Sequence, residues 1–143
     1  MRVRDIIHRD GRRIRIALAP REGGDGPLIR LSDPNRANGG TIMLDLYGAD
    51  LLAGFLMSAR LSKLGELSDE RCNGDCPLRL RLSAVGGEAR IELDQLGQRL
   101  VVGRPLWDRV YAELQMVLAH GRHLGRTAPS SGPALGEGRW LLH

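Results

Sequence analysis

Hydrophobic and polar residues alternate along several short stretches of the chain, which is the pattern of strands that bury one face. Residues 13–18 run Arg-Ile-Arg-Ile-Ala-Leu, so the isoleucines share one side and the arginines the other. Residues 78–82 repeat the pattern with leucine and arginine. Further short strands are expected at residues 3–8, 28–31, 41–46, 89–94 and 100–102. Such alternation is typical of antiparallel sheets with one face on the core and the other in water.

Two helices are expected, each directly after a short apolar strand. The second follows a break at Gly103-Arg104-Pro105, and its apolar residues recur at three-and-four spacing: Leu106, Val110, Leu114, Val117 and Leu118. Asp108 falls in its first turn, where a negative charge suits the helix dipole. Residues 41–61 show the same order of strand and helix, with Asp50 at the position of Asp108. The chain therefore contains two copies of a strands-then-helix unit.

The predicted fold class is α+β, with antiparallel sheets packed against two helices. The element order is ββββα then βββα, or ββββα twice, within one domain at residues 1–126. The two repeats span about residues 1–62 and 77–124, and residues 62–77 link them, with a short helical turn at Ser68-Asp69-Glu70. Residues 127–143 are rich in Gly, Ser and Pro without periodicity, so a disordered tail is expected. Its Trp140-Leu141-Leu142 is either a docking element or a chance feature.

Charge adds a basic bias to this picture. The net charge is +4, and Lys63 is the only lysine beside the arginines. Arginine binds phosphate through two parallel hydrogen bonds, which favours an anionic partner, although a GC-rich bacterial genome would produce the same bias. The exposed sheet face is predicted to carry seven arginines, which would bind nucleic acid or serve solubility alone: Arg13, Arg15, Arg30, Arg79, Arg81, Arg90 and Arg99.

The sequence offers little else that points to chemistry. No apolar run approaches the roughly 20 residues of a membrane span, and no signal peptide is recognisable, so a cytoplasmic protein is expected. There is no nucleophile elbow, P-loop or His-Glu-x-x-His motif. Asp5, Asp45 and Asp50 could form an acidic metal cluster, but scattered strand and cap carboxylates explain them as well. We predict no enzymatic activity and no cofactor.

Cys72 and Cys76 form a Cys-x3-Cys pair, and His120 and His123 lie three residues apart in the second helix. Two thiolates and two imidazoles suit tetrahedral zinc, and the two thiols could instead form a reversible disulfide. The interpretation adopted is two free thiols in a surface loop, with no bound metal.

Two stretches resemble a known superfamily. Val3-Arg4-Asp5, with Gly-Arg-Arg-Ile-Arg-Ile at residues 11–16, resembles the first hairpin of the eukaryotic positive transcriptional cofactor four. Residues 101–110, with Pro105 and Trp107, are similar to that family's strand, proline-containing turn and tryptophan-led helix. Two such units in one chain resemble the Whirly proteins, which belong to the same superfamily. The resemblance covers roughly residues 3–122.

The resemblance implies a transcription coactivator-like protein that binds single-stranded DNA on its sheet face, as a homo-oligomeric tetramer or dimer. Apolar helix positions that a partner subunit would cover are Phe55, Met57, Tyr111 and Met116. The Lys-Gly-Lys stretch of plant Whirly proteins is absent, and the predicted strands nearly lack aromatics. Because stacking is worth about 1–3 kcal/mol per base, binding would depend on arginine–phosphate contacts and on salt. The alternatives are an RNA-binding protein and a protein-interaction or assembly module.

Overall fold

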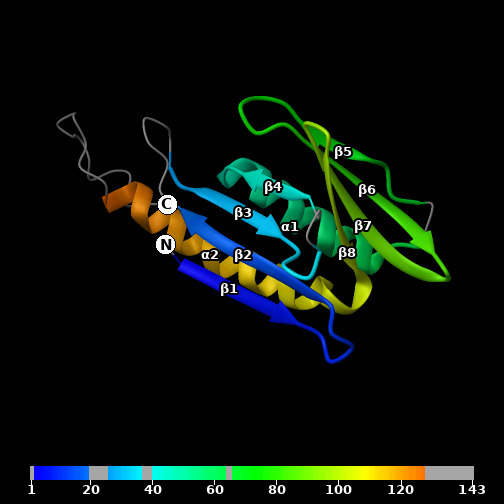
Figure 1. Cartoon of the computed structure of the whole chain (residues 1–143). Helices are drawn as coiled ribbons and strands as arrows, with labels where there is room; N and C mark the ends of the chain where they lie inside the picture. Colours follow the sequence, from blue (N-terminus) through cyan, green and yellow to red (C-terminus); the bar gives the residue numbers. More distant parts are fainter. Residues whose placement is uncertain (1, 20–25, 37–39, 64–65, 128–143) are drawn as a thin grey trace.

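The computed structural model describes residues 2–19, 26–36, 40–63 and 66–127 (Figure 1). Within these ranges it places all side chains except those of residues 2, 19 and 121–127. The described residues form two antiparallel four-stranded sheets and two helices, so the predicted α+β class is confirmed.

Each half of the chain supplies one sheet and the helix that follows it. Sheet A has the strand order β1-β2-β3-β4, with β1 (Arg2–Ile7), β2 (Arg13–Ala19), β3 (Leu28–Ser32) and β4 (Thr41–Leu44). Sheet B has the order β5-β6-β7-β8, with β5 (Glu70–Cys72), β6 (Leu78–Val85), β7 (Glu88–Gln95) and β8 (Gln98–Gly103). The helices are α1 (Leu46–Leu61) and, after a 3-10 turn (Arg104–Leu106), α2 (Trp107–Thr127).

Strand β5 lies within residues 62–77, which were expected to be a linker. Glu70–Cys72 pairs antiparallel with β6, with Glu70 opposite Leu80 and Cys72 opposite Leu78, so the predicted helical turn at residues 68–70 is wrong. The second unit is therefore ββββα, which was the alternative order. Of the three residues of β5, only Cys72 is buried. A strand this short, at the edge of a sheet, has too little alternation to be recognised from its sequence.

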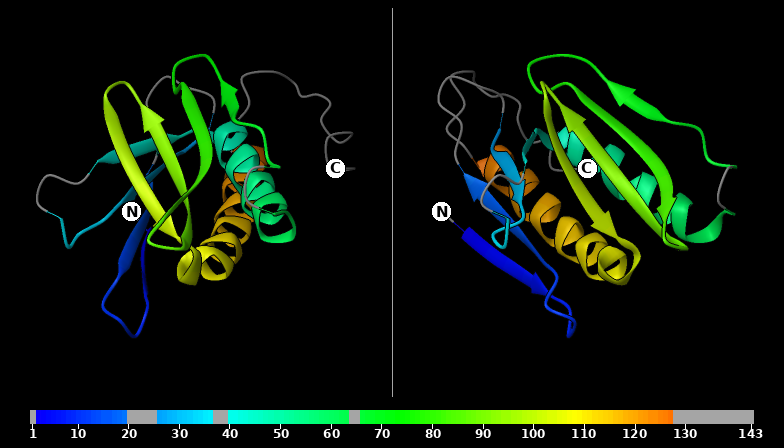
Figure 2. Two further views of the ribbon diagram at one scale, coloured as in Figure 1. Left: turned by 90° about the vertical axis from the view of Figure 1, so that its right-hand side faces the viewer. Right: turned by 45° about the vertical axis from the view of Figure 1, so that its right-hand side comes forward.

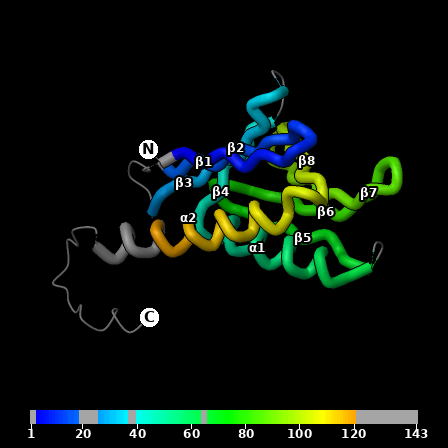
Figure 3. The backbone as a smooth tube through the Cα atoms, turned by 90° about the horizontal axis from the view of Figure 1, so that it is seen from below, coloured from blue at the N-terminus to red at the C-terminus, as the bar shows by residue number. Residues whose placement is uncertain are grey.

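The two sheets cover one pair of helices. α1 and α2 lie side by side (Figures 2 and 3), and a 3.2 Å ion pair joins Arg60 near the end of α1 to Asp108 in the first turn of α2. The core is continuous across both sheets and both helices. Phe55 is only 3 % exposed in this core, so it is not part of an uncovered helix face as predicted. Met57 and Tyr111 are half-buried, and Met116 is 54 % exposed.

The sheets meet where β4 approaches the ends of β7 and β8. The Gln95 side chain hydrogen-bonds both main-chain groups of Met43 in β4. Gly40 passes so close to the backbone of Arg99 that an added Cβ would lie 2.2 Å from its carbonyl oxygen. Arg12, in the β1–β2 turn, makes a two-pronged ion pair with Glu88 at the start of β7. These contacts fix how the outer faces of the two sheets lie relative to each other.

Several expectations fall outside the described residues. Of the tail expected at residues 127–143, only Thr127 is described, and it is the last residue of α2. The sequence also indicates a glycine-rich loop at residues 20–27, and this stretch is described only from Gly26. Within the described ranges, neither helix combines the length and the apolar character needed to cross a membrane.

Candidate nucleic-acid interface

The strand register places all seven predicted arginines on the outer faces of the sheets. In β2, Ile14 and Ile16 are 1 % exposed, so the arginines between and beside them point away from the core. In the other strands each predicted arginine is likewise next to a buried aliphatic residue, which is Ile29, Leu80, Ile91 or Leu100. Sheet A carries Arg13, Arg15 and Arg30, and sheet B carries Arg79, Arg81, Arg90 and Arg99. The seven residues therefore form two groups, whose electrostatic surroundings differ.

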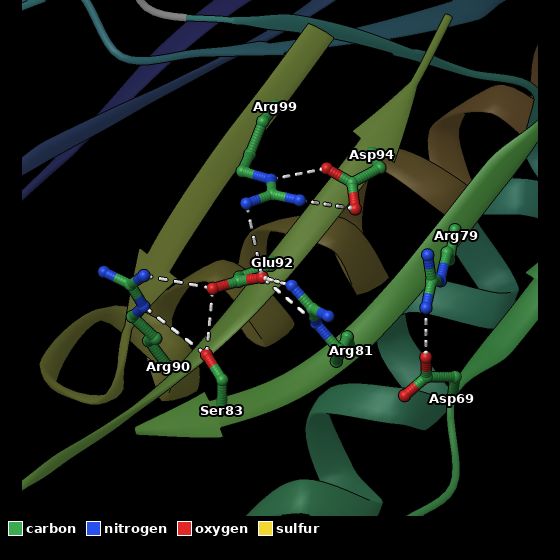
Figure 4. A network of polar contacts seen from close by, with 8 residues as sticks. All are labelled: Asp69, Arg79, Arg81, Ser83, Arg90, Glu92, Asp94 and Arg99. Carbon is green, nitrogen blue, oxygen red and sulfur yellow. Dashed lines mark hydrogen bonds and ion pairs between the residues drawn. The ribbon is translucent and has the colours of Figure 1, made fainter. Parts of the chain in front are cut away.

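The sheet B group surrounds a buried carboxylate (Figure 4). Glu92, in the middle of β7, is 3 % exposed and accepts hydrogen bonds from Arg81, from Arg90 at 3.0 Å and from the Ser83 hydroxyl at 3.0 Å. Arg99 Nη1 lies 3.7 Å from the same carboxylate. The hydrogen bond from Arg81 is the main cause that lowers the pKa of Glu92 to about 2. Glu92 is therefore a built-in counter-ion for three arginines.

The other sheet B arginines are also paired. Arg99 Nε donates to Asp94 Oδ1 at 2.6 Å, and Arg79 Nη2 donates to Asp69 Oδ2 at 2.9 Å (Figure 4). Glu92 and Asp94 occupy alternate positions of β7 in the sequence, so part of this pairing was visible before the structure. Asp69 was not expected, because it belongs to the stretch before the unrecognised strand β5. The four predicted arginines of sheet B thus each have a carboxylate partner, whereas Arg71 of β5, opposite Arg79, has no ion pair to a described residue.

Sheet A leaves a larger share of its arginines without a close carboxylate. Arg15 donates two hydrogen bonds to Asp5, at 2.8 and 3.1 Å, and this contact lowers the pKa of Asp5. Arg13 Nη1 is 3.9 Å from the same carboxylate, and the structure shows no hydrogen bond from the Arg13 side chain to a described residue. Arg30 is exposed and has no ion pair within the described part of the chain. The described strands of this face therefore carry three guanidinium groups and one carboxylate, which Arg13 and Arg15 share.

Two arginines in turns, Arg12 and Arg36, were not predicted as part of the site. A hollow of about 260 Å³ between the sheets is lined by Arg12 and Arg36, together with Arg13 and Arg90 from the predicted set. Both missed residues lie in turns, and the strand pattern carries no information about which turns meet. The Asp33-Pro34-Asn35 turn signal was the only hint that residue 36 is held in place.

The cysteines differ from expectation. Cys72 and Cys76 are 9 % and 8 % exposed, so both are buried, Cys72 in β5 and Cys76 in the bend before β6, and no disulfide joins them. Burial raises the pKa of Cys72. The described residues, which include His120 but not the His123 side chain, contain no group of three His, Cys, Asp or Glu residues placed to hold a metal ion. Asp45, considered above for an acidic metal cluster, caps α1 by accepting a 2.7 Å hydrogen bond from Gly48 N.

No protein-family model and no curated protein sequence matches this chain. Its class therefore rests on the fold and on the charged faces. It is an α+β protein in which two antiparallel four-stranded sheets cover a pair of helices and carry arginines on their outer faces.

Proposed function

We propose that this chain is a Whirly-like single-stranded DNA-binding protein that uses its arginine-bearing sheet faces with little sequence preference. The observation that carries the proposal is the outer face of sheet A, where Arg13 and Arg15 share the carboxylate of Asp5 and Arg30 has no ion pair to a described residue. Side chains two residues apart on a strand are about 7 Å apart, close to the spacing of adjacent phosphates on an extended strand. The excess of positive charge favours a polyanionic partner.

The charge distribution ranks the seven arginines. A guanidinium group has five N–H donors, so an ion-paired arginine can still donate to a phosphate, but its partner carboxylate repels that phosphate. Sheet B has such carboxylates at Asp69, Glu92 and Asp94. The main phosphate contacts are therefore assigned to sheet A, and sheet B makes weaker ones.

Weak sequence preference follows from the residue types on the strands. No strand residue is aromatic, so bases have no stacking platform on either outer face. Phosphate contacts position a nucleic acid but do not read its bases. Single-stranded DNA is chosen over duplex because of the resemblance to the Whirly proteins.

A homo-oligomer, tetramer or dimer, belongs to the same proposal. The edge strand β1 exposes Val3 at 49 % and Ile7 at 44 %, and α2 exposes Met116 at 54 %. An open sheet edge with apolar side chains favours pairing with another subunit. Light scattering at tens of micromolar protein should give a mass of two or four chains. A monomer at that concentration would rule out this part of the proposal.

The second candidate is a protein-interaction or assembly module. It is favoured by the ion pairs of sheet B, because a face whose arginines are already paired with carboxylates attracts a polyanion less strongly. This module would use the β1 edge to assemble and would not bind nucleic acid.

Fluorescence anisotropy separates these candidates. Labelled oligothymidylate, its duplex form and a single-stranded RNA of equal length are titrated at about 50 and 200 mM salt. The proposal predicts tightest binding to oligothymidylate and a marked loss at the higher salt. Preference for RNA would instead support the RNA-binding alternative, and binding to none of the three would leave the assembly module.

A further inference from the structure

A hollow of about 260 Å³ lies between the two sheets, where the β1–β2 turn approaches β7, β8 and the 3-10 turn. Its charged lining residues are four arginines and two carboxylates: Arg12, Arg13, Arg36, Arg90, Asp33 and Glu88. This is an excess of two positive charges within one concave space. The volume is enough for several water molecules at roughly 30 Å³ each, and so for one phosphate group with bridging water.

Arg36 is held at this hollow by a chain of turn contacts. Asp33 Oδ1 accepts from Asn35 N at 2.9 Å, which closes a side-chain turn. Asn35 Nδ2 in turn donates to Gly11 O at 2.8 Å, and so ties the β3–β4 connection to the β1–β2 turn. Arg36 therefore lies beside the turn that carries Arg12, although 24 residues separate Asn35 from Gly11 in the sequence.

The four arginines differ in how many donors they keep free. Arg12 is already engaged by Asp10 and Glu88, so it supplies charge but few free N–H groups. Arg90 uses Nε and Nη2 for Ser83 and Glu92. Arg36 has no ion pair to a described residue, and Arg13 Nε is buried without a hydrogen-bond partner in the described part of the chain. Unsatisfied donors beside two fixed positive charges are what a phosphate oxyanion requires.

We propose that this hollow is a phosphate-binding subsite in which Arg13 and Arg36 donate directly to a phosphate group. The inference rests on the proposed function, under which the group is a backbone phosphate of a single strand that passes from sheet A to sheet B. Arg12 and Arg90 lower the electrostatic cost of placing that phosphate between the sheets. Free inorganic phosphate has the same chemistry, so the experiment includes it as a separate probe.

The experiment compares Arg36→Gln with the control Arg71→Gln. Arg71 is also exposed, and it lies opposite Arg79 on the outer face of sheet B, outside the hollow, so both variants lose one positive charge from an arginine-bearing surface. Neither arginine has an ion pair to a described residue, so both variants should fold. Oligothymidylate binding is measured by anisotropy over a range of salt. Separately, the Nε–H signals of Arg13, Arg15, Arg30 and Arg36 are followed by NMR during titration with oligothymidylate or with inorganic phosphate.

The proposal predicts that oligothymidylate shifts the Arg13 and Arg36 signals, and that inorganic phosphate shifts them less at equal phosphate concentration. Arg36→Gln should weaken oligothymidylate binding roughly tenfold relative to Arg71→Gln, as expected for one lost hydrogen bond between charged groups. Its log–log salt slope should be flatter by about 0.7.

Two results would overturn the subsite in distinguishable ways. If oligothymidylate binds and shifts Arg15 and Arg30 only, with equal affinities for the two variants, the hollow is no subsite and the proposed function stands. If oligothymidylate does not bind at all, the proposed function is wrong, and so is the assignment of the ligand as a backbone phosphate. Shifts with inorganic phosphate would then make the hollow a site for the free anion, and their absence would leave it without a ligand.

Discussion

The Gln95 side chain joins the two sheets, because its amide hydrogen-bonds the main chain of Met43 as a neighbouring strand would. Gln95 Oε1 accepts from Met43 N at 2.7 Å, and Gln95 Nε2 donates to Met43 O at 2.6 Å. The same nitrogen also donates to Pro77 O at 2.8 Å. Gln95 is 8 % exposed, so the edge of β4 is closed by a buried amide at the end of β7. The relative position of the two arginine groups depends on this contact.

Gln95→Leu is therefore expected to lower the free energy of unfolding by about 2–4 kcal/mol. The substitution removes both partners of Met43 and leaves a buried N–H and C=O without hydrogen bonds, each of which costs about 1–3 kcal/mol. Urea unfolding of the two proteins measures the difference. Gln98→Leu is the control. The Gln98 side chain accepts one hydrogen bond from a described residue, Thr41 N, and that bond is exposed and long at 3.4 Å. Equal losses in both variants would show that Gln95 has no special role at the junction.

Glu92 makes stability depend on pH. Its pKa is about 2 in the folded protein against 4.5 as the usual value, so it contributes stability above about pH 4.5 that is lost as the pH falls toward 2. At roughly 1.4 kcal/mol per pKa unit, this contribution is about 3–4 kcal/mol. Glu92→Gln should lose it at neutral pH and show a flatter stability profile between pH 5 and 2 (roughly the window of that titration).

Urea unfolding at a series of pH values tests this, with Glu70→Gln in the exposed edge strand β5 as the control. The control should keep the slope of the wild type in this window. A Glu92→Gln profile parallel to that of the wild type would mean that Glu92 is not the counter-ion described above.

Burial of Cys72 and Cys76 predicts slow thiol chemistry. The raised pKa of Cys72 and the low exposure of both sulfurs should make them react with a disulfide reagent far more slowly in the native protein than in urea. Cys72→Ser with Cys76→Ser should cost roughly 1–3 kcal/mol, because it places hydroxyl groups where thiols were buried. Fast labelling of both thiols in the native protein, with unchanged stability of the double variant, would contradict this account.

The sequence predicted most clearly what depends on local periodicity. Strands β2 and β6 were visible because isoleucine or leucine alternates with arginine, and α2 because of its spaced apolar residues. Strand β5 was missed because three residues at an edge show almost no pattern. The buried state of Phe55 could not be seen either, since it depends on how the two helices pack.

The candidate site divides in the same way. The outward direction of Arg13 and Arg81 follows from a period of two, whereas their pairing with Asp5 and Glu92 depends on which strands are neighbours. Arg36 was missed because a turn has no periodicity, and only the hydrogen bond from Asn35 to Gly11 shows where it lies.

The central claim is that the outer face of sheet A binds phosphates, and a salt titration on oligothymidylate tests it most directly. If Arg13, Arg15 and Arg30 each contact one phosphate, these contacts should contribute about −2 to the log–log slope of the wild type, at about −0.7 per phosphate. Arg13→Ala with Arg15→Ala should flatten the slope by roughly 1.4 and weaken binding to all sequences alike.

Arg79→Ala with Arg81→Ala is the matched control on sheet B, and its smaller effect is expected because Asp69 and Glu92 already hold these arginines. Stability of the sheet A variant should change by less than about 1 kcal/mol, since the Arg15–Asp5 pair is partly exposed. The account predicts a clearly flatter slope for the sheet A variant than for the wild type and the sheet B variant. Equal slopes and equal affinities in all three proteins would contradict it.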